Sequence, residues 1–331
     1  MSLLLLILGA LQVLGAAAVA ALSLGGIAGA VSPRLDLLTH FTPIYLGLGV
    51  LGLLTCFLAR GRLRLVSAGL SALTILACAI LMVPEYAARG LDRAPASAAN
   101  QLKVLQFNAY GGYGQDRTAA ADWIVAQNPD VIVLEEAGGL DVPVAAKGGY
   151  FVNFGSTAAM ILGHSKAVSN NAPDWGVISA LPPEKRFYAL VSRASFRDGH
   201  GAYTVMGVHR PWPMHTAQTA AHAAELRQLL ATYGASTAIV AGDFNSTPWS
   251  FDLRRLDRSL PVTRRTRAVF SWPAARVSHN RLPIPLPLLP IDQVYAGSAW
   301  KTVKVERGPN LGSDHYPVLV TLARVAAPAG R

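Results

Sequence analysis

The chain of 331 residues contains only two cysteines, Cys56 and Cys78, and both lie in apolar stretches of its first hundred residues. No cysteine follows Cys78, which excludes a disulfide framework or a cysteine-based zinc site in the rest of the chain. The lack of thiols in that part is compatible with an oxidising compartment.

Several catalytic motifs are also missing. The sequence has no Gly-x-Ser-x-Gly turn, no His-Glu-x-x-His pair and no phosphate-binding P-loop. These absences argue against a serine hydrolase with a nucleophile elbow, a zinc peptidase of that type and a P-loop nucleotidase.

Charge is scarce near the N-terminus, where residues 1–99 carry six Lys or Arg and three Asp or Glu. Three runs, residues 3–31, 41–59 and 65–83, contain no charged side chain at all. At about 1.5 Å per residue, each run is long enough as a helix to cross a hydrocarbon core of roughly 30 Å. The sequence therefore predicts three transmembrane helices within residues 1–90 and a multi-pass protein of the cell membrane. Transport through these helices is disfavoured, because their cores hold no charged residue to form an ion path.

The arginines between the runs predict an orientation. Arg60, Arg62 and Arg64 lie between the second and third runs, and the positive-inside rule places them in the cytoplasm. The third helix then carries the rest of the chain to the extracytoplasmic side, although Arg89 and Arg93 after that helix argue the other way.

A cleavable signal peptide is the alternative interpretation of the first run. Residues 28–30, Ala-Gly-Ala, resemble a small-residue cleavage site. The run is long, however, and lacks a basic start, so we favour a membrane helix. Cleavage would leave the predicted orientation unchanged.

The rest of the chain is basic. Residues 91–101 read as a short linker, and from residue 100 onward there are 23 Lys or Arg against 16 Asp or Glu. An excess of about seven positive charges suits an anionic partner such as nucleic acid, a phospholipid surface or a phosphorylated substrate. The densest basic segment, residues 254–267, either binds such phosphates or is a solvated face.

A buried strand predicted over residues 237–241 leads directly to Asp243 and Asn245. Residues two apart in a strand point to the same side, so both side chains would reach one cleft while Phe244 packs away from it. The alternative is an ordinary strand end closed by an Asx turn.

Other predicted strands also end on polar residues. Helices predicted over residues 118–128, with Thr118 as N-cap, and 215–233 separate some of these strands. The polar residues at the strand ends are Asn108, Glu136, His209, Asp243, Asn245, Asp292, Asp314 and His315. This set holds hard oxygen ligands and two histidines without cysteine, which favours Mg²⁺ or Mn²⁺ over zinc and a phosphate ester over a peptide.

In order along the chain, these residues resemble the motifs of the endonuclease/exonuclease/phosphatase superfamily. The matching segments are Gln106-Phe107-Asn108, Pro129-Asp130 to Glu136, Val208-His209, Gly242-Asp243-Phe244-Asn245-Ser246, Ile291-Asp292-Gln293 and Ser313-Asp314-His315. The family includes DNase I-like nucleases, neutral sphingomyelinases and inositol phosphate phosphatases, and this chain resembles a membrane-anchored bacterial branch of it.

The resemblance implies a four-layer α/β sandwich, with two mixed β-sheets face to face and helices outside. The expected organisation is a transmembrane region at 1–90, a linker at 91–101, a catalytic domain at 102–325 and a tail at 326–331. The implied activity is hydrolysis of a phosphate ester by in-line attack of an activated water with Mg²⁺ or Mn²⁺. Nucleic acid and phospholipid head groups both remain open as substrates.

Roles for single residues also follow from the resemblance. The metal would be held by Glu136, with Asn108 nearby and Asp314 in support. Asp243 would orient or deprotonate the water, and Asn245 would bind phosphate oxygens. The remaining implied roles are contact of His315 with the scissile phosphate, orientation of His315 by Asp292, and a general-acid or leaving-group role for His209.

The sequence departs from the family pattern at three positions: Glu135 stands where the family often has Gln, Lys166 where it often has Arg, and Gln293 where His or Tyr is common. None of these changes removes a catalytic atom. The alternative function is a non-catalytic, membrane-anchored binding module that keeps the fold. The intact set of acids and histidines argues against this alternative.

Overall fold

The computed structural model describes residues 3–112, 115–154, 159–171, 191–274 and 286–325. The predicted tail at 326–331 lies outside these residues. The chain folds into two compact units, one formed by Met1–Arg89 with Ser246–Arg255 and the other by Gly90–Asn245 with Leu256–Arg331. We call them the helical unit and the sheet unit. Residues 246–255, which the sequence assigned to the catalytic domain, thus group with the N-terminal helices.

Among its described residues, the helical unit has three helices long and apolar enough to cross a membrane, with candidate spans at Leu6–Ala30, Pro33–Leu58 and Gly61–Gly90. Each corresponds to one of the uncharged runs. Close packing relies on small residues, because a Cβ on Gly52 would lie 2.6 Å from Ser71 Oγ. The elements of this unit are α1 (Leu3–Ile27), η1 (Ala28–Ala30), α2 (Pro33–Asp36), η2 (Leu37–Phe41), α3 (Thr42–Thr55), η3 (Cys56–Leu58), α4 (Gly61–Ala87), η4 (Ala88–Gly90) and the start of α10 (Phe251–Ser259).

The sheet unit contains two mixed six-stranded sheets among its described residues. The first has the order β11-β12-β1-β2-β4-β3, from β1 (Gln101–Asn108), β2 (Val131–Glu135), β3 (Phe151–Phe154), β4 (Ala159–Gly163), β11 (Trp300–Arg307) and β12 (Val318–Arg324). The second has the order β5-β6-β7-β8-β10-β9, from β5 (Ser169–Asn170), β6 (Ser192–Asp198), β7 (Gly201–His209), β8 (Ala238–Asp243), β9 (Thr263–Arg264) and β10 (Asp292–Ala296).

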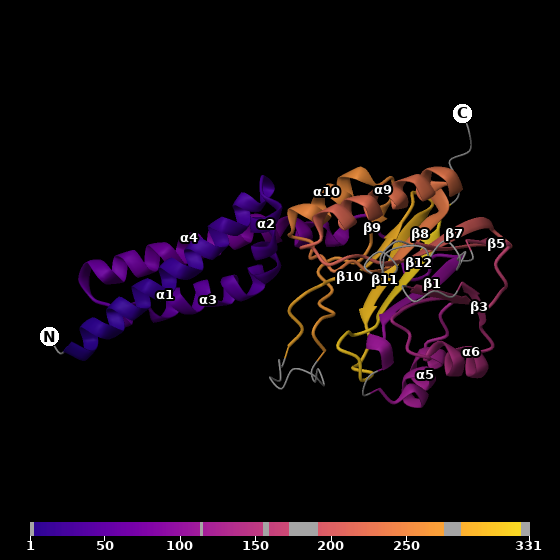
Figure 1. Cartoon of the computed structure of the whole chain (residues 1–331), viewed down its shortest axis with the longest axis horizontal. Helices are drawn as coiled ribbons and strands as arrows, with labels where there is room; N and C mark the ends of the chain where they lie inside the picture. Colours follow the sequence, from indigo (N-terminus) through magenta and orange to yellow (C-terminus); the bar gives the residue numbers. More distant parts are fainter. Residues whose placement is uncertain (1–2, 113–114, 155–158, 172–190, 275–285, 326–331) are drawn as a thin grey trace. The chain divides into compact units, whose positions relative to one another are not determined.

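Helices flank the sheets, with α5 (Arg117–Ala126) and α6 (Asp141–Gly148) on one side and α9 (Thr216–Tyr233) on the opposite side (Figure 1). Short 3-10 turns, η5 (Tyr110–Gly112) and η6 (Ala235–Thr237), complete the unit. The predicted α/β sandwich is therefore confirmed. One local prediction is wrong: Asp116, not Thr118, caps α5, since its Oδ1 accepts from the backbone N–H groups of Thr118 and Ala119.

Alternation along the strands separates two cores. In β1, Leu102 and Val104 belong to the core between the two sheets, whereas Leu105 and Phe107 belong to the core under α5 and α6. Because side chains alternate between the two faces of a strand, Gln106 and Asn108 lie on the same face as Leu102 and Val104, toward the other sheet. Polar residues thus replace apolar ones where the space between the sheets meets the end of the strands.

Candidate active site

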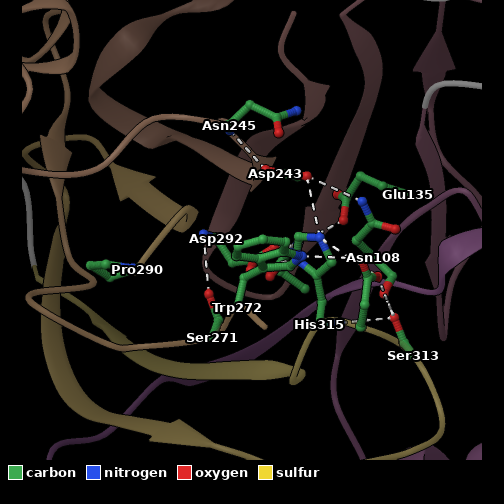
Figure 2. A network of polar contacts seen from close by, with 12 residues as sticks. Asn108, Glu135, Asp243, Asn245, Ser271, Trp272, Pro290, Asp292, Ser313 and His315 are labelled. Carbon is green, nitrogen blue, oxygen red and sulfur yellow. Dashed lines mark hydrogen bonds and ion pairs between the residues drawn. The ribbon is translucent and has the colours of Figure 1, made fainter. Parts of the chain in front are cut away.

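Strand register brings three of the predicted residues side by side in the second sheet. His209 at the end of β7 pairs with Asp243 at the end of β8, and Asp243 pairs with Asp292 at the start of β10. In the first sheet, Asn108 at the end of β1 pairs with Glu135 at the end of β2. Both sheets therefore present polar side chains at one end (Figure 2).

His315 sits between two carboxylates. Its Nδ1 lies 2.9 Å from Oδ2 of Asp292, and its Nε2 lies 3.7 Å from Oδ2 of Asp243. All three side chains are buried. Burial alone would lower the pKa of His315, but the charges of Asp292 and Asp243 outweigh it and raise that pKa to about 10. The imidazole is therefore a cation at neutral pH.

Burial opposes the ionisation of the Asp243 carboxyl group. Burial raises its pKa to about 6, even though the neighbouring charge of His315 acts to lower it. A carboxyl group with a pKa near neutrality can accept a proton from a bound water and later release it.

Asn108 connects the two sheets. Its Nδ2 donates to Oδ2 of Asp243 at 3.1 Å and to Oε1 of Glu136 at 3.2 Å. Its Oδ1 accepts from the backbone N–H of Tyr110 at 2.9 Å. The amide nitrogen thus faces the two carboxylates and orients both of them.

Glu136 is the most exposed acid of the group, with 37% of its side chain accessible. It directly follows β2 with a left-handed backbone, φ 45°, so it does not continue the strand alternation. Its Oε1 lies 3.7 Å from Nε2 of His209, which also lies 3.9 Å from Oδ2 of Asp243. The fold thus places two carboxylates beside His209.

Asp314 also approaches the imidazole of His315, with its Oδ1 4.0 Å from Nε2. Its Oδ2 accepts from the indole N–H of Trp272 at 3.0 Å. Ser313 ties this segment to β1, because its hydroxyl donates to the carbonyl of Asn108 at 2.7 Å and accepts from the backbone N–H of His315.

Asn245 is placed by a turn. The strand β8 ends at Asp243, and Asn245 has a left-handed backbone with φ 49°. Its backbone N–H donates to Oδ1 of Asp243 at 2.7 Å, which is an Asx turn, and its Nδ2 donates to the carbonyl of Arg210 at 2.8 Å. The prediction that strand alternation continues from Asp243 to Asn245 is therefore wrong. The Asx turn, which was the alternative, is present, and Asp243 also belongs to a cluster of polar residues.

Gln106 lies in the first matching motif, but the sequence predicted no role for it. Its Nε2 donates to Oε2 of Glu135 at 2.7 Å and to Oδ1 of Asp292 at 2.8 Å, which bridges the two sheets. Burial and the charge of Asp292 hold the pKa of Glu135 well above its usual range. The available signal was position: Gln106 lies two residues before Asn108, on the same face of β1.

Two arginines of the basic segment have structural roles in the sheet unit. Arg264 and Arg265 are buried. Arg264 pairs with Asp257 at 2.9 Å, and Arg265 lies 3.2 Å from Asp92 and donates to backbone carbonyls of residues 296, 297 and 300. These two guanidinium groups are thus neither a solvated face nor free to bind phosphates.

The donor chemistry fits a hard divalent cation. Among the described residues no three His, Cys, Asp or Glu side chains are grouped as a metal cluster. Mg²⁺ is usually held by one or two carboxylates together with waters and substrate phosphate oxygens. Glu136, half-exposed and oriented by Asn108, offers such a carboxylate.

Seven of the eight predicted side chains thus meet at one end of the two sheets, whereas Asn245 joins the network through its backbone N–H and turns its amide to the Arg210 carbonyl. Their individual roles stay predictions. The contacts across the sheets, from Asn108 to Asp243 and from Gln106 to Asp292, join the polar residues of the two sheets into one network.

Comparison with known proteins gives one family. Residues 105–315 match the sequence profile described as the Endonuclease/Exonuclease/phosphatase family. Among curated proteins no match to the chain was found.

Solved structures with a similar fold cover about two thirds of the chain. One is an endonuclease/exonuclease/phosphatase family protein from Bacteroides thetaiotaomicron, with TM-score 0.53, 14% identity and coverage of 69% of this chain and 99% of that one. Another is a protein of unknown function from Enterococcus faecalis V583, with TM-score 0.52, 14% identity and coverage of 68% and 100%. The human Nocturnin catalytic domain gives TM-score 0.50, 15% identity and coverage of 69% and 95%. At these identities the likeness shows the fold alone.

Proposed function

Because the chain belongs to the endonuclease/exonuclease/phosphatase family, we propose that it is a membrane-anchored, Mg²⁺- or Mn²⁺-dependent hydrolase of phosphate esters. Endonucleases, exonucleases and phosphatases all cleave such esters. The observation that carries the proposal is the buried His315 between Asp292 and Asp243, since it sets a cation beside a base. A binding module would have no need of this costly arrangement of buried charges.

Asp243 accepts the proton of the attacking water. Its pKa of about 6 leaves the carboxylate ionised at neutral pH yet basic enough to take a proton in the transition state. The amide of Asn108 donates to Oδ2 of Asp243 and holds this oxygen in place. Attack then occurs in line with the departing oxygen of the ester.

His315 stabilises the charge that develops on the phosphoryl group. Asp292 binds its Nδ1 and keeps the ring cationic, so the Nε2–H is available to a phosphoryl oxygen. A fixed donor in a buried site costs no reorganisation during the reaction, and such donors contribute about 10²–10³-fold to rate.

The other predicted residues surround these two. Asn245 has a second Nδ2 hydrogen beyond the one donated to the Arg210 carbonyl, and we assign it to a phosphate oxygen. His209 serves as the proton donor to the leaving oxygen, with its Nε2 held beside the carboxylates of Glu136 and Asp243. Trp272 orients Asp314 beside His315.

Glu136 would hold the metal ion, with Asp314 in support and Asn108 orienting Glu136. When bound, a divalent ion supplies Lewis-acid stabilisation of the phosphoryl charge. The substrate is a phosphate diester or monoester of nucleic acid or of a phospholipid head group. The short linker to the membrane helices favours the lipid, and the arginine loop at residues 60–64 favours an extracytoplasmic site.

The test is hydrolysis by the full chain, purified in detergent, of DNA, RNA, sphingomyelin and phosphoinositides with Mg²⁺ and with EDTA. We expect turnover of at least one substrate with Mg²⁺ and none with EDTA. Asp243→Ala and His315→Ala should each lower kcat by about 10²–10⁴-fold with the fold retained. Matched controls are Asp122→Ala and His200→Ala, which change exposed residues remote from the cluster.

Two outcomes would contradict the proposal. A wild-type turnover rate in Asp243→Ala or His315→Ala would contradict the proposed mechanism. Binding of a phosphate ester without hydrolysis under every condition would favour the binding module. A reporter enzyme fused to the C-terminus tests the orientation, and reporter activity in the cytoplasm would reject an extracytoplasmic site.

A further inference from the structure

Two glycine-bearing loops of the sheet unit meet beside the candidate site. The first loop, residues 109–112, directly follows Asn108 at the end of β1. The second loop, residues 137–139, directly follows Glu136, whose carbonyl accepts a hydrogen bond from the backbone N–H of Gly111 at 2.8 Å. Both loops therefore continue from residues of the polar network, and a hydrogen bond joins them.

These loops approach each other too closely for side chains. The four glycines at their contact all have left-handed backbones, with φ between 55° and 86°. A Cβ on Gly138 would lie 2.2 Å from the carbonyl carbon of Gly111, so only glycine fits there. We call this surface of bare backbone the glycine shelf, and its residues are 111–112 and 138–139.

The guanidinium of Arg117 lies against the glycine shelf. A Cβ on Gly112 would lie 2.9 Å from both Nε and Nη2 of Arg117, and a Cβ on Gly139 would lie 3.6 Å from Nη1. The guanidinium therefore occupies the space that a side chain at residue 112 would fill. The shelf thus holds a cation close to the loops that follow Asn108 and Glu136.

No described residue neutralises this cation. The Arg117 side chain is exposed, and its guanidinium forms no hydrogen bond or ion pair within the described part of the chain. The neighbouring carboxylate of Asp116 instead caps α5, since its Oδ1 accepts from the backbone N–H groups of Thr118 and Ala119. Arg117 is also the first residue of α5, where the positive end of the helix dipole disfavours a cation. A bound anion would offset this repulsion.

We propose that Arg117 binds a second phosphate of the substrate, next to the phosphate that is hydrolysed. The planar fork of guanidinium donors matches two oxygens of one phosphate. Glu136 and Gly139 are three residues apart, so their Cα atoms are separated by at most about 11 Å. The guanidinium on the shelf is therefore within reach of a group that flanks a phosphate bound near Glu136.

This inference rests on the proposed function and narrows its substrate class. The favoured substrate carries at least two neighbouring phosphates, as a phosphoinositide head group or a nucleic acid does. Sphingomyelin, with a single phosphate and a cationic head group, would gain nothing from Arg117. The two sources of neighbouring phosphates share the same chemistry, and the tests below separate them.

The first test measures binding by isothermal titration calorimetry on the full chain in detergent, with EDTA to keep the probes intact. One pair of probes is glycerophosphoinositol bisphosphate and glycerophosphoinositol, and the other is a thymidine tetranucleotide and a dinucleotide with one phosphate. The wild type should bind the multi-phosphate member of one pair at least about tenfold more tightly than its single-phosphate partner. That pair identifies the source.

Changes at Arg117 should act only on the multi-phosphate probe. Arg117→Ala should weaken its binding by about 10–100-fold, because a charge-assisted hydrogen bond is lost, and should leave the single-phosphate probe within about twofold. Arg117→Lys should recover part of the loss, since an ammonium keeps the charge without the planar fork. The matched control is Arg197→Ala, an exposed change that pairs with Ala202 at the start of β7, and it should keep wild-type affinities.

The second test measures steady-state kinetics on the preferred multi-phosphate probe with Mg²⁺. Arg117→Ala should raise KM by about tenfold or more and change kcat by less than about threefold, because the phosphate that Arg117 binds does not react. This pattern differs from that of Asp243→Ala or His315→Ala, which should lower kcat.

The outcomes separate the inference from the proposed function. Unchanged binding in Arg117→Ala, or equal weakening of both members of a pair, would overturn the inference, as would binding of no multi-phosphate probe by the unaltered chain. A loss in kcat without a rise in KM would also contradict it. Binding that depends on Arg117, together with no hydrolysis of any probe with Mg²⁺ or Mn²⁺, would support the anion site and overturn the proposed function.

Discussion

Oδ2 of Asp292 lies 2.9 Å from Nδ1 of His315, and both side chains are buried. This contact determines the direction of the imidazole, since it turns Nε2 toward Asp243. It also opposes the effect of burial on the imidazole pKa. The single interaction thus controls both the geometry and the charge of the proposed phosphoryl contact.

Replacing Asp292 should change the pH dependence of hydrolysis. The pKa of His315, about 10, means that its cation persists below that pH and is lost as pH rises through it. Asp292→Asn removes the largest opposing charge, so the pKa falls and the cation is lost at lower pH. We expect kcat/KM of the wild type to hold to about pH 9, and that of the variant to decline below it, with kcat reduced about 10²–10⁴-fold. A variant profile with an unshifted alkaline limb would contradict this role.

Gln106 should matter for stability as well as for activity. Gln106→Met keeps the length of the side chain but removes the donor to Glu135 and Asp292, and leaves two buried acceptors without it. The expected loss is about 1–3 kcal/mol in the free energy of unfolding of the sheet unit. Thermal unfolding in detergent measures it, with Gln228→Met on the exposed side of α9 as control. Equal stability of the two variants would show that the bridge contributes nothing.

Gly242 should tolerate no side chain. A Cβ at this position would lie 1.8 Å from the carbonyl oxygen of Val208, within the parallel pairing of β7 and β8. Gly242→Ala should therefore separate the strand ends that carry His209 and Asp243, at a cost of about 3 kcal/mol and with loss of hydrolysis. Gly199→Ala is the control, because a Cβ there meets nothing within 4 Å. A folded and active Gly242→Ala protein would refute the prediction.

Glu225 should make stability depend on pH. Burial raises its pKa to about 7, although a hydrogen bond from the Val191 backbone N–H acts to lower it. Stability from this group is complete below the unfolded pKa, about 4.3, and is lost as pH rises through about 7. Glu225→Gln should remove that loss and gain on the order of 1 kcal/mol relative to wild type at pH 8, after allowance for partial exposure. Melting temperatures from pH 4 to pH 8 test it, and parallel curves for both proteins would speak against it.

Local patterns determined much of this protein. The uncharged runs predicted the three long apolar helices, because burial in a hydrocarbon phase excludes charge over a fixed length. Polar residues at the ends of predicted strands marked Asn108, Glu136, His209, Asp243, Asp292 and His315 as candidates, since the end of an apolar run is visible from neighbouring residues alone. The ordered motifs gave the family and the fold.

Tertiary structure decided how these residues meet. The bridge from Gln106 to Asp292 spans 186 residues, and the Asp36 cap on α10 spans 215. The left-handed turn at Asn245 replaced the strand that alternation predicted, and Arg264 and Arg265 became buried structural cations. Interactions of this kind depend on sheet pairing and packing over long separations, which local periodicity does not encode. The sequence therefore predicted which residue types form the candidate site. Only the fold showed which residues they contact.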